Sequence, residues 1–235
     1  MVAIWIGCAP PGPLPPMTAG ELVAAMSSQQ TYSSLKAGGS VTLDDGQIER
    51  NALMTIQARV PTHLRADIIG LFGVSLASFA LVGDEGTAWY PRDGVAVYFS
   101  GGVLPLIEDM SVRAEHLFAA ISPPKPDLLG FRTTCQVWAR RYLLRTETAE
   151  GMREWWISPD PMRVVEEAAF DSLGAPLWHR RFRRENGITV PFEIDIFAGS
   201  SSSRIVLNSI TLGPTIGDGA FVIQVPTDAK IVRTR

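Results

Sequence analysis

The sequence predicts a mainly β (α+β) protein, a single domain of about 11 antiparallel strands and two helices. Three observations predict this class. Apolar and polar residues alternate along most of the chain, which is the period of half-buried antiparallel strands. Turn residues recur roughly every 10 positions, as in a meander. The length of 235 residues, with 46% apolar and 19% charged residues, suits one large β domain.

Residues 1–17 are expected to lie outside that domain, which spans 18–235. A short apolar run meets Gly7 and Cys8, and the Pro-rich stretch 10–16 then reads as a stiff, extended tether. This resembles the end of a bacterial lipoprotein signal, where cleavage precedes a Cys that is then lipidated. We therefore expect a lipid anchor at Cys8, the alternative being an incidental cysteine near a loose terminus.

A helix is expected at the start of the domain. Thr18 and Glu21 fit a capping box, in which the Thr caps the helix and the Glu reaches back from three residues later. Leu22 and Val23 continue an amphipathic pattern that ends near Gln30.

Alternating strands follow from Ser34. Met54 and Ile56 share one face of the segment 51–60, and Leu64 and Ile68 share one face of the next. Later strand-like segments are expected at 136–146, 152–158, 162–170, 176–185, 190–198, 204–212 and 220–225.

Residues 109–121 interrupt the alternation. Val112, Leu117, Phe118 and Ile121 form a helical stripe, which a run of prolines ends. Because an apolar stripe must cover an apolar surface, this helix is expected to plug the concave face of the sheet.

The expected inward face of the sheet is apolar and rich in aromatic residues. Such a face is either an ordinary packed core or an apolar cavity for a hydrophobic ligand. The residues expected to line it are Met54, Ile56, Leu64, Ile68, Trp89, Phe99, Leu117, Trp138, Trp156, Phe192, Ile194 and Ile196.

Recognisable catalytic chemistry is absent from the sequence. HExxH, GxSxG, Walker and CxxC motifs do not occur, and the three histidines stand alone. Cys135 reads as a small buried hydrophobe, and the net charge of −3 argues against nucleic acid as a partner. We therefore expect a protein without catalytic activity, without a cofactor and without a metal site.

Alternation along 180–184 places Arg181 and Arg183 on one face and Arg180 and Arg184 on the other with Phe182. These arginines suggest a solvated face or a patch for anionic lipid or an acidic protein.

One hairpin tip has unusual residues. Gly70 to Gly73 reads GLFG, with Leu71 and Phe72 where turns normally carry polar residues or Pro. Two large apolar side chains at a hairpin tip call for a specific reason, since turn geometry does not require them.

The order of these elements resembles the LolA/LolB lipoprotein-carrier superfamily. The resemblance rests on the tethering Cys, the capped helix, and the stretches Tyr32 to Leu43, Pro61 to Pro91 and Asn208 to Val232. It implies a strongly curved, incomplete antiparallel β-barrel of about 11 strands. Helices close its concave cavity, which takes the acyl chains of lipoproteins.

The resemblance also implies a function without covalent chemistry. In the receptor branch an exposed apolar residue on a hairpin places cargo in the membrane, and Leu71 and Phe72 occupy the matching tip. The resemblance implies that both side chains are exposed to enter a bilayer or meet a partner carrier, the alternative being that the loop folds back onto a helix. The chain would be a monomeric, lipid-anchored periplasmic protein that binds acyl chains and helps localise lipoproteins to the outer membrane. Ala9 agrees with that membrane, since Asp at this place favours retention in the inner one.

The expected partners are lipoprotein acyl chains or other lipid, a soluble periplasmic lipoprotein carrier, and the membrane surface. The alternative is a non-transferring envelope sensor or assembly module that has the same fold and a filled core.

Overall fold

The structure is a computed structural model that describes part of the chain. The described residues are 13–27, 32–44, 46–100, 103–105, 111–113, 126, 132–149, 151–184 and 190–233. Cys8, Leu117 and most of the expected helix at 109–121 lie outside them.

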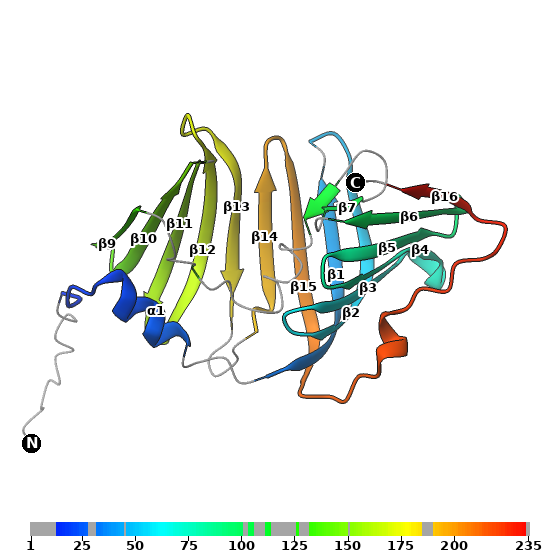
Figure 1. Ribbon diagram of the computed structural model, residues 1–235, viewed down its shortest axis with the longest axis horizontal. Coiled ribbons are helices and arrows are strands. Elements are labelled where there is room, and N and C mark those ends of the chain that lie inside the picture. Colours follow the sequence, from blue (N-terminus) through cyan, green and yellow to red (C-terminus); the bar gives the residue numbers. More distant parts are fainter. Residues whose placement is uncertain are drawn as a thin grey trace, which may run out of the picture.

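A 14-stranded sheet, curved and open, forms most of the described fold (Figure 1). Neighbouring strands are antiparallel, except that β16 pairs with β6 in parallel. In spatial order the strands are β16 (Lys230–Arg233), β6 (Val95–Ser100), β5 (Glu85–Tyr90), β4 (Ser75–Val82), β3 (His63–Ile69), β2 (Glu49–Arg59), β1 (Ser34–Asp44), β15 (Ser201–Leu212), β14 (Glu193–Ala198), β13 (Pro176–Arg183), β12 (Met162–Asp171), β11 (Gly151–Pro159), β10 (Arg141–Thr148) and β9 (Arg132–Trp138).

The first strand joins the two halves of the sheet. β1 pairs with β2 on one side and with the late strand β15 on the other, so each half is a meander. The β1–β15 ladder slips between Gly38 and Gly39. A Cβ on Gly39 would lie 1.9 Å from the Val206 carbonyl oxygen, so only glycine permits this close approach.

The core lies on the concave face of the sheet. Register places Ile56 beside Ala66, then Phe79, Ala88 and Val97 on successive strands, and all five are buried. This confirms the alternation predicted for 51–60 and for the strand that follows it.

Helix α1 (Ala19–Ser27) covers the concave face at the β9–β12 end (Figure 1). Leu22 is fully buried in the same cluster as Tyr142 and Val164. The Tyr142 hydroxyl donates to the Pro15 carbonyl at 3.0 Å, which holds the extended segment before the helix against the sheet.

Several expected elements differ from the structure. The sheet has 14 strands, more than the expected 11 or so; among the differences, 136–146 is divided between β9 and β10, and β16 was not predicted. Ser111–Arg113, inside the expected helix, forms strand β8 and pairs with β7 (Val103–Pro105). The expected strand at 220–225 instead begins with the 3₁₀ turn η2 (Asp218–Phe221). Among the described residues α1 is the one α-helix, so a second helix that closes the concave face is not shown.

Candidate functional site

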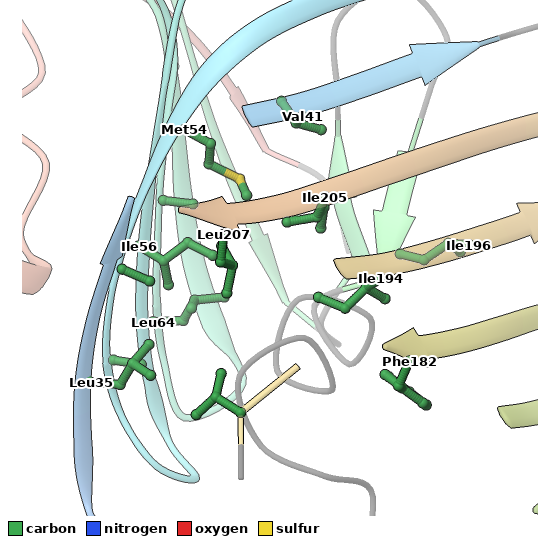
Figure 2. Packing of buried hydrophobic residues seen from close by; sticks show 14 of the residues in the cluster. Leu35, Val41, Met54, Ile56, Leu64, Phe182, Ile194, Ile196, Ile205 and Leu207 are labelled. Carbon is green, nitrogen blue, oxygen red and sulfur yellow. The ribbon is translucent and has the colours of Figure 1, made fainter. Parts of the chain in front are cut away.

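The concave face gathers apolar side chains from both halves of the sheet. Figure 2 shows Met54, Ile56 and Leu64 of β2 and β3 across from Ile194 and other side chains of β13–β15. The expected lining residues found in this buried cluster are Met54, Ile56, Leu64, Ile68, Phe99, Ile194 and Ile196.

Four expected lining residues lie elsewhere. Trp89 pairs with Ser78, whose hydroxyl donates to Asp67 on the convex face, so Trp89 faces outward too. Trp138 is 60% exposed. Trp156 also faces outward, 6.2 Å from the His179 ring, and its neighbour Trp155 takes the buried position.

Phe192, the fourth, precedes β14 and is half-buried outside the cluster. The other expected lining residue, Leu117, lies outside the described residues, and so does the proposed anchor Cys8.

A buried ion pair interrupts the apolar face. Arg180 donates to Glu167 at 2.6 Å, and the two side chains are 3% and 1% exposed. The Arg180 guanidinium also lies 4.3 Å from the centroid of the Trp178 ring. Register brings Glu167 of β12 opposite Arg180 of β13 on the same face as Trp155. Arg180 shares the face of Phe182, as the alternation predicted, but its carboxylate partner Glu167 was not predicted.

The remaining arginines of β13 do not form a free basic patch. Arg181 and Arg183 point to the convex face, as the alternation predicted. Arg183 pairs with Glu193 at 3.0 Å, and Arg181 lies 4.0 Å from Glu166. Because carboxylates stand beside these arginines, the strand does not resemble a docking surface for an anionic partner.

The β3–β4 tip exposes its apolar residues. Leu71 and Phe72, in the 3₁₀ turn η1 (Leu71–Gly73), are 80% and 100% exposed. The turn is closed by the Gly70 amide, which donates to the Val74 carbonyl at 2.8 Å. The described structure therefore does not show these two side chains folded back onto a helix.

Cys135 fits a structural role better than a chemical one. It is half-buried against the core, and burial raises the pKa of its thiol, which disfavours the reactive thiolate. Within the described ranges, no three His, Cys, Asp or Glu residues gather as a metal site would require. The described helices include none of the length and apolarity needed to cross a membrane.

Comparison with known proteins identifies the fold. No protein-family model matches the chain, and no curated protein matches it either. Among solved structures, a DUF1329 family protein from Desulfovibrio piger superposes with a TM-score of 0.67 at 11% identity, over 86% of this chain and 95% of that one.

Two further structures give the same picture. A LolA superfamily protein from Nitrosomonas europaea has a TM-score of 0.62 at 10% identity, over 88% of this chain and 99% of that one. A domain from Vibrio parahaemolyticus, described as an outer membrane lipoprotein-sorting protein, has a TM-score of 0.62 at 12% identity, over 86% and 94%. The resemblance predicted from the sequence is therefore confirmed at the level of the fold: this chain has the fold of LolA-superfamily proteins.

Proposed function

We propose that the chain is a cell-envelope protein that binds acyl chains on the concave face of its sheet. Its cargo would be lipoproteins or other acylated ligands, which it would deliver to the outer membrane from a lipid anchor at Cys8. The observation that carries the proposal is an apolar concave face in the same molecule as an exposed Leu71–Phe72 tip. The fold shared with LolA-superfamily structures supports it.

Transfer on such a face needs no covalent step. An acyl chain would move to whichever site buries more of its surface, at roughly 25 cal/mol per Å². The exposed tip would enter the acyl boundary of the bilayer or meet the mouth of a periplasmic carrier. Burial of two such side chains contributes roughly 1.5–3 kcal/mol each.

A second candidate function rests on the burial of the same face. Ile56, Leu64, Ile194 and Ile205 are each no more than 2% exposed, as expected of a filled core. With a filled core the chain would be a non-transferring sensor or assembly module.

Lipid binding and one cavity-filling variant separate the two candidates. Ala66 lies between Ile56 and Phe79 in register, so Ala66→Leu adds volume at the centre of the concave face. If acyl chains occupy this face, native protein co-purifies with lipid and the variant binds a palmitoylated peptide less tightly.

If the face is filled, no lipid is found by mass spectrometry and Ala66→Leu lowers the free energy of unfolding by about 1–3 kcal/mol. Thr55→Leu on the exposed face of β2 is the matched control, which changes neither quantity. The second outcome would contradict the proposal.

The tip is tested separately. Replacing Leu71 and Phe72 with Asp together should not lower the free energy of unfolding by more than about 0.5 kcal/mol, since both side chains are already in water. The same variant, made in the Cys8→Ser chain, should lose association with liposomes in flotation. A strongly lowered denaturation midpoint would show that the tip is structural.

A further inference from the structure

The hairpin tips of the sheet are divided between two rims. Asp44 pairs with Ser202, which brings the tips 46–48 and 199–200 to one rim, and the pairing of Leu53 with Ile69 brings 70–74 there. The pairing of His179 with Phe197 brings the start of β13 and the tip 172–175 to the same rim. The pairing of Trp89 with Ser78 brings the tip 91–94 to this rim too, and the pairing of Gly151 with Asp171 brings Ala149 there. We call the rim formed by 46–48, 70–74, 91–94, 149, 172–175 and 199–200 the tip rim.

A second exposed apolar tip lies on the tip rim. Leu173, between β12 and β13, is 93% exposed. The Asp171 carboxylate accepts from the Leu173 and Ala175 amides at 2.9 and 2.8 Å, and the Gly174 amide donates to the Asp171 carbonyl. Asp171 and Gly174, with its φ of 82°, supply the turn chemistry, so the fold does not require an apolar side chain at 173.

The opposite rim has a different character. Its described tips present exposed polar or charged residues: Thr62, Asp84, Arg140 and Asp160. In the described part of the chain, three large apolar side chains are at least 80% exposed, namely Leu71, Phe72 and Leu173, and all three stand on the tip rim. The tip rim also carries the exposed charged residues Arg92 and Asp93, so the two rims differ in these three apolar side chains and not in charge.

We propose that Leu173 is a second membrane-entering point on the tip rim. The inference rests on the proposed function, in which Leu71 and Phe72 enter the membrane. The two apolar points lie on separate hairpins, with the tips 46–48 and 199–200 between them in strand order, so they would enter the bilayer at two separate places. Neither 70–74 nor 172–175 contains a charged residue, so the interaction should not require anionic lipid.

The test uses an environment-sensitive fluorophore on the full chain. In a Cys8→Ser, Cys135→Ser background, cysteine is introduced by Leu173→Cys, Phe72→Cys or Asp84→Cys and labelled with NBD. With phosphatidylcholine vesicles, the labels at 173 and 72 should shift to the blue and brighten, and the label at 84 on the opposite rim should not. Leu173→Asp should weaken flotation with these vesicles about tenfold, as expected for the loss of one buried Leu.

The outcomes separate the inference from the proposed function. A blue shift of the label at 72 without one at 173 overturns the membrane role of Leu173 and leaves the proposed function standing. A shift at neither position overturns the membrane role of both Leu173 and the Leu71–Phe72 tip. A shift at 84 as well would mean non-specific partitioning and would overturn the assignment of membrane entry to the tip rim. An unchanged denaturation midpoint for Leu173→Asp confirms that this variant is folded.

Discussion

The backbone at Phe72 is strained. Its φ of 61° and ψ of 20° are left-handed, a region that bulky residues rarely adopt. Asn tolerates this region, so Phe72→Asn should raise the free energy of unfolding by about 0.5–1 kcal/mol in chemical denaturation. Leu71→Asn, at a neighbouring exposed position without positive φ, should not. Equal gains for both variants would show that the effect comes from surface polarity and not from the backbone.

The buried Glu167–Arg180 pair gives a second prediction. Both charges are buried, so removing one partner takes a charge-assisted hydrogen bond of 2.6 Å from a charge that is out of water. Glu167→Leu or Arg180→Met alone should lower the free energy of unfolding by about 3–5 kcal/mol. The double variant should recover most of this loss, because it buries no charge. If the double variant is as unstable as the single ones, the pair is held by other polar contacts in this region.

The start of α1 shows how a local element depends on pH. Glu21 accepts from both the amide and the hydroxyl of Thr18 at 2.8 Å, which confirms the predicted capping box. These hydrogen bonds hold the pKa of the Glu21 carboxyl below its ordinary 4.5. The stabilisation is therefore present above the unfolded pKa and is lost as pH falls through the lowered folded value.

Comparison with Glu21→Gln measures this contribution. The difference in free energy of unfolding between wild type and variant should be constant near neutral pH and should shrink as pH falls from about 5 to 3. A difference that does not depend on pH would contradict the role of the carboxylate. Thr18→Ala should lower stability at neutral pH by about 1 kcal/mol through loss of the cap.

Elements with clean alternation were predictable from the sequence. β2 and β3 have one buried and one more exposed face, and their buried positions were assigned correctly. In β14 Ile194 and Ile196 are buried as expected, but Asp195 between them is buried as well. The β9–β10 turn was missed because Ala139 and Arg140 adopt positive φ without Gly, Asn or Pro to signal it. At β11 a register shift lies between Trp156 and Ile157, and period-2 reasoning cannot locate such a shift.

The tryptophans explain the errors at the candidate site. Large apolar residues were expected to face inward, but the inward positions of β5 are taken by Gly86, Ala88 and Tyr90. Phe99 packs over Gly86, where a Cβ would lie 2.1 Å from the ring, and Ala88 occupies the next inward position, leaving Trp89 outside. The buried Glu167–Arg180 pair depends on register across the β12–β13 hairpin, which a single sequence does not specify.

At the scale of the whole molecule, the N-terminal segment and the tip rim lie at opposite ends of the strands. Pro15 contacts Tyr142 near the start of β10, and β10 then runs toward the tip rim. The seven residues from Cys8 to Pro15 span at most about 25 Å. The seven residues from Tyr142 to Ala149 rise about 23 Å. An anchor at Cys8 therefore reaches the level of the tip rim only through a nearly extended tether.

Tether length should therefore control whether the tips contact the membrane that holds the anchor. Deleting residues 10–12 shortens the reach by about 10 Å. In the lipidated chain with Cys135→Ser, this deletion should abolish the blue shift of NBD at Phe72→Cys while fractionation with the membrane is unchanged. Inserting Gly-Ser-Gly-Ser after Gly12 should preserve the shift, since added length does not restrict reach. If the deletion leaves the shift intact, the segment around Pro15 must leave the sheet when the chain is anchored, and the Tyr142–Pro15 hydrogen bond would then break on the membrane.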